Sequence, residues 1–390
     1  MKFLRRFCAV IIGITFLVSG LSKIIDPVGT MLIVTEYLKL LHLGFLIPGA
    51  KVLGVVLSTL EAVTGLALIT GVLRKIAAWV SFVLVGFFTI VTLFLLVKNP
   101  DMDCGCFGEA FHLSHLQSFL KNIGLVALSL VAFLPLGKLG SPRPRKWVSF
   151  GIAVLSVLYA VLYSNTHIPV LDFTEFAPGT ELMASLDDDI EADNHYEPAF
   201  IYEKNGQRGS FPLYALPDST WTFIGADTLF VDGLARRNGH PVLSFRDSEG
   251  EYQDRLAAEG KVVVFSVYNP GKASWERVQK QYYQVIEAGG TPLLLVASHP
   301  LEIDSYDIPI DMAVYYADYK TLITLNRSNG GASYFCEGEL IEKWDQRGFP
   351  ASLGWHLAAD PVERSSHFIL NRRLKAQGFS LYLTALLLLL

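Results

Sequence analysis

The chain has few cysteines, only four in 390 residues, and no two of them form a Cys-x-x-Cys pair. Structural zinc sites need four ligands, which such pairs usually supply, so the sequence argues against this kind of site. Charged residues are also scarce: they make up 18% of the chain, whereas hydrophobic residues make up 51%. This balance is too apolar for an ordinary soluble protein.

The hydrophobic excess is confined to the first 165 residues, in runs long enough to cross a hydrocarbon core of about 30 Å as helices. Five runs are predicted to span a membrane: residues 7–25, 51–72, 76–97, 118–137 and 147–164. The first could pass for a signal peptide, but it lacks a convincing small-x-small cleavage site, so we expect it to be retained. Residues 27–48 are interrupted by Pro27 and Pro48, which favours an interfacial helix or a re-entrant segment.

Lysine and arginine residues mark one side of the predicted membrane. They collect before the first span and in two of the loops: Lys2, Arg5, Arg6, Arg74, Lys75, Lys138, Arg143, Arg145 and Lys146. Short loops rich in these residues stay in the cytoplasm. We therefore expect a cytoplasmic N-terminus and an exported chain after residue 165. In a bacterium this is an inner-membrane protein with a periplasmic C-terminal domain.

The two halves differ in charge. Residues 1–165 hold 14 Lys/Arg and 6 Asp/Glu, a net of +8, and the remainder holds 18 and 31, a net of −13. An acidic exported part without a basic patch argues against nucleic acid and against docking on anionic lipid. The lipid bilayer around the spans is the partner that this composition predicts.

Two of the four cysteines, Cys104 and Cys106, lie one glycine apart in the loop between the third and fourth spans. A disulfide between residues i and i+2 closes a small, strained ring, and strain makes such a bond easier to reduce. Gly105 lacks the Cβ that would hinder the tight turn. The motif therefore favours dithiol–disulfide exchange over structural cross-linking.

Other interpretations of the two thiols stay open. They could bind a metal ion with His112 and His115, which follow in the same loop. They could also be idle. The remaining cysteines, Cys8 and Cys336, are predicted to be buried and inert.

Glu61 lies midway along the second predicted span, where an ionised carboxylate is expensive and usually functional. It is either protonated or paired with a polar group, for which Lys23 and Asn122 are candidates. The alternative is an interhelical hydrogen bond that only fixes packing. Gly65 and Gly71 would let a neighbouring helix approach closely.

Four short motifs in the first 137 residues carry a family resemblance. They are Ser19-Gly20-Leu21-Ser22-Lys23-Ile24-Ile25-Asp26-Pro27, then Leu60-Glu61 with Gly65, then Asp103-Cys104-Gly105-Cys106-Phe107-Gly108, then Leu120-Lys121-Asn122. Together they resemble the DoxX/MauE-like membrane proteins. The resemblance implies a four-helix membrane bundle over residues 1–137, with residues 138–165 as an additional fifth span and tether.

The resemblance also implies a function. The MauE branch is associated with disulfide formation or the supply of redox equivalents during maturation of an exported enzyme, and DoxX relatives are linked to quinone-coupled sulfur oxidation. The chain is thus expected to be a thiol-redox membrane protein, with Cys104, Cys106 and Glu61 as site residues. A periplasmic thiol/disulfide protein is the expected partner, and a quinone is the candidate cofactor.

The exported half is predicted to be β-rich over residues 166–240 and α/β over 241–378. The lead-in contains strand-like runs at 199–202 and 221–224 and an acidic loop at 186–196. The α/β pattern consists of a strand at 261–267, a helix from Trp275 to Ile286, a strand at 292–297 and a hairpin of 332–336 with 340–344. An apolar tail, 379–390, is too short to span.

The order of elements over 241–350 resembles the thioredoxin-like fold, fused to a membrane half as in an architecture found in Bacteroidetes. However, residues 268–273, where thioredoxins carry Cys-x-x-Cys, contain no cysteine. The position of the usual cis-proline is Asn329-Gly330-Gly331. This domain is therefore expected to be non-catalytic, because dithiol exchange needs the thiols.

The expected fold is thus a membrane α-helical bundle, a four-helix DoxX/MauE-like core plus a fifth span, followed by an α/β thioredoxin-like soluble domain. Two functions remain in competition: a thiol–disulfide oxidoreductase, and a membrane-anchored binding or scaffold protein with a recognition domain. A transporter with Glu61 on its pathway has little support, because no internal repeat is evident.

Overall fold

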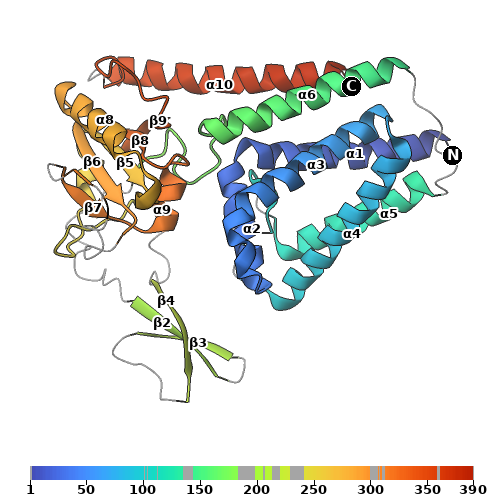
Figure 1. The fold of residues 1–390 in the computed structure, drawn as a ribbon, viewed down its shortest axis with the longest axis horizontal. Helices are drawn as coiled ribbons and strands as arrows, with labels where there is room; N and C mark the ends of the chain where they lie inside the picture. The colour runs from blue at the N-terminus through green and yellow to red at the C-terminus, as the bar shows by residue number, and fades with distance from the viewer. Residues whose placement is uncertain are drawn as a thin grey trace. The chain divides into compact units, whose positions relative to one another are not determined.

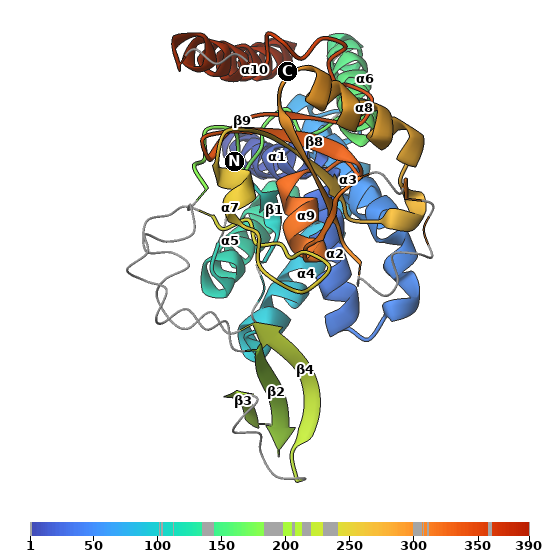
Figure 2. The same cartoon turned by 90° about the vertical axis from the view of Figure 1, so that its left-hand side faces the viewer.

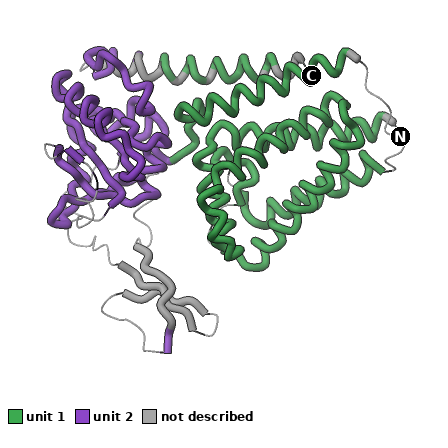
Figure 3. The backbone as a smooth tube through the Cα atoms, viewed as in Figure 1, with its two compact units in different colours: residues 1–174, 369–390 green, residues 175–368 purple. Residues whose placement is uncertain are grey.

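The computed structural model describes the chain from residue 2 to residue 389, with gaps. The residues left out are 101, 103, 112, 135–143, 183–197, 205–206, 213–219, 229–240, 299–305, 307, 310–311 and 358–360. The chain divides into two compact units, shown in Figure 3. The first comprises residues 1–174 and 369–390, and the second residues 175–368.

The first unit is a helical membrane bundle. Its long helices are α1 (Lys2–Ile25), α3 (Ala50–Thr70), α4 (Arg74–Lys98), α5 (His115–Phe133) and α6 (Pro144–Thr166). Each contains a stretch long and apolar enough to cross a membrane, so the five predicted spans are confirmed as candidates by length and composition. Helix α1 packs along α3, and α4 along α5 (Figure 1).

Between the first two spans, the interrupted segment forms a separate helix, α2 (Pro27–Leu40), and a short 3₁₀ helix, η1 (Gly44–Gly49). The Asp26 carboxylate caps α2 by accepting a hydrogen bond from the Gly29 N–H, and Pro27 occupies the first helical turn. The two prolines thus begin one helix and lie within the other, which fits their predicted role as interruptions.

Helices α1 and α3 come into very close contact at Gly65. A Cβ atom at this position would lie 2.6 Å from both the Gly13 carbonyl oxygen and the Leu17 nitrogen. The prediction that Gly65 permits close approach is therefore confirmed. Gly71 has a different role, because it adopts a φ of +76° and ends α3.

Helix α6 packs against α1 and α3 through a small apolar cluster. Its members are Leu17, Leu21, Ile24, Ala62, Leu66, Ala153 and Val157. Tyr382, from the last helix α10 (Pro361–Leu389), also packs against this cluster. The predicted apolar tail is thus not a separate segment but the last part of a 29-residue helix, which is not one of the five candidate spans.

The second unit contains a mixed five-stranded sheet in the order β7-β6-β5-β8-β9. The strands are β5 (Lys261–Val267), β6 (Thr291–Val296), β7 (Val314–Tyr316), β8 (Gly331–Cys336) and β9 (Glu339–Trp344). Strands β5, β6 and β7 are parallel, whereas β8 and β9 form an antiparallel hairpin beside β5. The predicted strands and hairpin are therefore confirmed, together with the α/β class of this domain.

Helices cover both faces of this sheet. Helix α8 (Trp275–Glu287) packs on the side chains of Val263, Phe265 and Val267. Two short helices, α7 (Arg255–Ala258) and α9 (Tyr319–Leu325), pack on the opposite face with Val262 and Val264. Both faces of β5 are thus buried, which explains its continuous run of apolar residues.

A separate three-stranded antiparallel sheet precedes the α/β part, with β2 (Pro198–Lys204) between β3 (Gln207–Pro212) and β4 (Thr222–Thr228), as Figure 2 shows. Strand β2 contains the first run predicted in the lead-in, and β4 begins at Thr222, one residue into the second predicted run. The predicted acidic loop, 186–196, lies outside the described residues.

Candidate functional site

The two clustered cysteines face each other in the loop between α4 and α5. Their Sγ atoms lie 3.0 Å apart as free thiols. Gly105, between them, has a φ of +64°, and a Cβ atom there would collide with the Ile33 side chain of α2. The glycine thus allows both the turn and its close packing.

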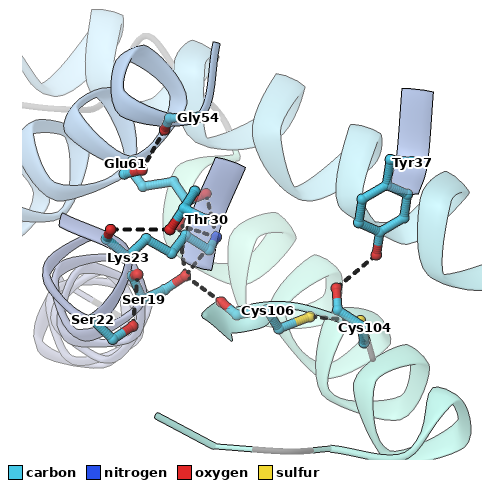
Figure 4. A network of polar contacts seen from close by, with 10 residues as sticks. Ser19, Ser22, Lys23, Thr30, Tyr37, Gly54, Glu61, Cys104 and Cys106 are labelled. Carbon is cyan, nitrogen blue, oxygen red and sulfur yellow. Dashed lines mark hydrogen bonds and ion pairs between the residues drawn. The ribbon is translucent and has the colours of Figure 1, made fainter. Parts of the chain in front are cut away.

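Two side chains fix the backbone of this dithiol loop from different helices (Figure 4). The Tyr37 hydroxyl of α2 donates a hydrogen bond to the Cys104 carbonyl, with an O···O distance of 2.6 Å. The Ser19 hydroxyl of α1 lies 2.7 Å from the Cys106 carbonyl oxygen. The carbonyls of both cysteines are therefore held by side chains of the surrounding bundle.

Ser19 connects the loop to a buried ion pair. The Lys23 ammonium lies 2.8 Å and 3.0 Å from the two carboxylate oxygens of Glu61, whose side chain is fully buried. The Ser19 Oγ atom lies 2.6 Å from Glu61 Oε2. The Ser19 hydroxyl has one proton, so it donates to one of these two acceptors at a time, and its oxygen lies between the Glu61 carboxylate and the Cys106 carbonyl oxygen.

Lys23 and Asn122 are the two partners predicted for Glu61. The prediction of Lys23 is confirmed, and the prediction of Asn122 is wrong. The Asn122 amide of α5 instead donates to the Phe88 carbonyl and to the Thr92 hydroxyl, both on α4. Asn122 therefore joins α4 to α5, whereas Lys23 joins α1 to α3.

A second lysine, Lys121 of α5, lies near the thiols. The Lys121 ammonium lies 4.9 Å from the centre of the ring of Phe107, the residue that follows Cys106, and Lys121 lines the same cavity as Cys106. The pKa of Cys106 is lowered to about 5, mainly because the Cys104 thiol donates a hydrogen bond to it, and Lys121 adds to this shift. The pKa of Cys104 is raised, because it provides that hydrogen bond and is buried.

A cavity of about 480 Å³ adjoins the dithiol within the membrane unit. Both cysteines line it, together with Lys23, Tyr37 and Lys121. The rest of its wall is largely aliphatic and aromatic, drawn from α1 to α5. Several wall residues, Leu53, Val56, Leu60 and Phe87, are also exposed. The site therefore combines two thiols, two cations and an apolar chamber.

The described residues around the dithiol do not favour the interpretation that the two thiols bind a metal ion. Among the residues that it describes, no three His, Cys, Asp or Glu side chains gather closely enough to hold a metal ion. His115 lies 3.0 Å from the Met102 carbonyl oxygen through Nε2 and 3.3 Å from Asn99 Oδ1 through Nδ1. His112 lies outside the described residues.

The second unit offers no dithiol. The turn after β5 contains a 3₁₀ helix, η5 (Pro270–Lys272), and no cysteine. The Asn329 side chain accepts from the Asn269 N–H and donates to the Asn269 carbonyl, both at 2.9 Å. Cys336 is 5% exposed within the sheet core, and Cys8 is 4% exposed in the bundle, so both are buried as predicted.

Sequence reasoning found the two cysteines and Glu61 but gave no role to Ser19, Tyr37 or Lys121. Ser19 and Lys23 are four residues apart on one helix, so their common face could have been recognised. Nothing in the sequence places Tyr37 against Cys104, because 67 residues separate them.

Two family comparisons give matches. Residues 1–135 match the family described as "Methylamine utilisation protein MauE", and residues 196–232 match a "Domain of unknown function (DUF8463)". No curated protein and no solved structure matches the chain. Over residues 1–135, which include the first four candidate spans and the dithiol loop, this membrane protein is therefore similar to the MauE family.

Proposed function

We propose that the membrane unit is a thiol–disulfide oxidoreductase that uses Cys104 and Cys106 to exchange a disulfide with an exported protein. The observation that carries this proposal is the contact of the two Sγ atoms at 3.0 Å, in a loop held by Ser19 and Tyr37. Idle thiols would not require a loop fixed from two helices, nor a buried ion pair behind it. The distribution of lysine and arginine favours the outer face of the inner membrane for this loop.

The exchange is balanced without any further reagent. One thiolate of the pair attacks a disulfide of the partner, forming a mixed disulfide and releasing one partner thiolate. The second cysteine then attacks the first, which closes the Cys104–Cys106 disulfide and releases the second partner sulfur. Two electrons and two protons thereby pass to the partner. The reverse sequence oxidises the partner, and the relative reduction potentials decide the direction.

The chamber beside the dithiol fits a quinone. Its wall is mostly apolar, as a lipid-soluble ring requires, and the Lys121 ammonium supplies a donor for a ring oxygen. When bound, a quinone would supply a two-electron, two-proton acceptor for the dithiol. This chain's own contribution is to keep Cys104 and Cys106 at the wall of that chamber.

The exported α/β domain is proposed to be a thioredoxin-like recognition module that presents the partner to the membrane dithiol. Its strand order and the helices on both sheet faces support this identity. Because the turn at residues 268–273 holds no cysteine, the domain contributes binding and not electron transfer.

The proposal is tested with a Cys104→Ser/Cys106→Ser double variant in cells of the natural host. We expect disulfide-containing exported proteins to accumulate in the wrong oxidation state, as revealed by alkylation mass shifts. A Cys8→Ser/Cys336→Ser variant is the matched control, because it also loses two cysteines but leaves the dithiol loop intact. Exported proteins with unchanged oxidation states in the first variant would contradict the proposal.

A membrane-anchored scaffold is the second candidate, favoured by the cysteine-free turn of the α/β domain. In that case the double serine variant would capture the same exported partner with the same affinity and support its maturation fully. Partner capture retained together with loss of partner oxidation would favour the oxidoreductase instead.

A further inference from the structure

The two cysteines of the dithiol loop differ in their surroundings, and this difference bears on the proposed exchange reaction. Cys104 is 5% exposed and therefore nearly closed to a large partner. Cys106 retains exposed surface, and both residues line the chamber. Attack on a partner disulfide needs an accessible thiolate, so burial alone favours Cys106 for this step.

Charge favours the same cysteine. Lys121 of α5 lines the chamber with Cys106, with its ammonium over the ring of the next residue, Phe107, and within the described part of the chain no carboxylate forms an ion pair with it. Lys23 of α1 also acts on Cys106, but its charge is largely neutralised by Glu61 at 2.8 Å. Among the described residues, Lys121 therefore provides the positive charge that stabilises a thiolate at Cys106.

The other described titratable groups around the loop do not reverse this balance. Tyr37 of α2 uses its hydroxyl proton to hold the Cys104 carbonyl, and burial raises its pKa, so it stays neutral. The Glu109 side chain lies against the first turn of α2, near Gly29. His115 is engaged with the loop at Met102. Of the charged groups that the structure describes around the loop, the Lys121 cation thus favours the thiolate at Cys106 most directly.

We propose that Cys106 is the attacking cysteine, that Lys121 holds it as a thiolate, and that Cys104 is the resolving cysteine. This inference rests on the proposed exchange reaction. The Cys106 thiolate forms a bond to one partner sulfur, and the other partner sulfur leaves as a thiolate. Cys104 then loses its proton to that thiolate, and its sulfur attacks Cys106 Sγ, 3.0 Å away in the reduced state. The bond between Cys106 and the partner breaks, and the partner sulfur takes a proton from water.

The order of attack is tested by trapping in full-length protein. Without the resolving cysteine, a mixed disulfide persists, so a Cys104→Ser variant should accumulate one on Cys106. A Cys106→Ser variant should accumulate at least tenfold less. The two are compared by non-reducing gels and mass spectrometry after incubation with oxidised glutathione and with exported proteins of the host.

The role of Lys121 is tested in the Cys104→Ser background, where serine can still donate a hydrogen bond to Cys106. The pH midpoint of Cys106 alkylation by iodoacetamide should rise by about one unit or more in Lys121→Gln, because a positive charge that favours the thiolate is lost. Lys121→Arg should restore most of the shift. Lys39→Gln, which removes an exposed lysine paired with Glu36, is the control and should leave the midpoint unchanged.

The outcomes separate this inference from the function on which it rests. Mixed disulfides on Cys104, or a midpoint that does not move in Lys121→Gln, would overturn the assignment while leaving the exchange reaction intact. If neither single variant forms a mixed disulfide, both the assignment and the exchange reaction are contradicted.

Discussion

Lys23 and Glu61 form an ion pair in the interior of the membrane bundle, with a distance of 2.8 Å between Lys23 Nζ and Glu61 Oε1. The carboxylate is fully buried, and the lysine side chain is 9% exposed. Charges in such surroundings are expensive and are kept where they have a function. Here the pair lies behind the dithiol loop and is connected to it by Ser19.

Removing one member of this pair should destabilise the protein strongly. In Glu61→Ala, the Lys23 ammonium stays buried without its partner, and the free energy of unfolding should fall by about 3–5 kcal/mol. Chemical denaturation in detergent measures this loss. Glu36→Ala, which breaks the exposed pair with Lys39, is the control and should change stability by less than about 1 kcal/mol. Equal losses in the two variants would contradict a special role for the buried pair.

The contact between α1 and α3 at Gly65 should also be disrupted by a single substitution. In Gly65→Ala, the new methyl group would lie 2.6 Å from the α1 backbone, so α1 must move and carry Ser19 and Lys23 away from Glu61. We expect lower stability and slower thiol–disulfide exchange, measured by denaturation and by reaction with oxidised glutathione. Gly86→Ala is the matched control, because a Cβ atom there meets no neighbour within 4 Å. It should be neutral or stabilising by up to about 1 kcal/mol.

The hydroxyl of Tyr37 should protect the resolving cysteine. Tyr37→Phe removes the hydrogen bond to the Cys104 carbonyl and nothing else, at an expected cost of about 0.5–1.5 kcal/mol. The loop is then held on one side only, and Cys104 should be alkylated severalfold faster in a Cys106→Ser background. Tyr159→Phe, at an exposed site on α6, serves as the control. An unchanged alkylation rate in Tyr37→Phe would show that the hydrogen bond does not restrain the loop.

The reduced dithiol should also make stability depend on pH. The pKa of Cys106 lies at about 5 in the folded protein, below its ordinary value of 9.0, so its contribution is complete above pH 9 and is lost as the pH falls toward 5. Cys104 has a raised pKa, so above pH 9 it opposes folding. The stability difference between wild type and the double serine variant should therefore increase from pH 5 to pH 9 and decrease above it. A difference that stays constant over this range would contradict the two shifts.

Much of the fold followed from patterns along the chain, because membrane spans and buried strands are encoded locally. Runs of apolar residues predicted the five spans, and the alternation of strand and helix predicted the sheet of the second unit. The C-terminal helix was missed because Arg372, Arg373 and Lys375 interrupt its hydropathy, although they do not interrupt helical geometry.

The site was only partly predictable. The cost of a buried carboxylate pointed to a partner for Glu61, but the choice between Lys23 and Asn122 depends on which helices are neighbours. Tyr37 of α2 is 67 residues from Cys104 in sequence, and Lys121 lies on α5. The chamber between them forms only when helices α1 to α5 pack together. These features arise from tertiary structure, so no local pattern could reveal them.

The central claim is that the Cys104–Cys106 pair changes oxidation state in the membrane. The most direct measurement is an alkylation mass shift of the Cys8→Ser/Cys336→Ser protein in native membranes, before and after a mild reductant. We predict that the number of alkylated thiols changes by two. If the pair is oxidised in the membrane, two thiols become reactive after reduction, and if it is reduced, treatment with a mild oxidant protects two thiols from alkylation. The same number of alkylated thiols under every redox condition would contradict the account.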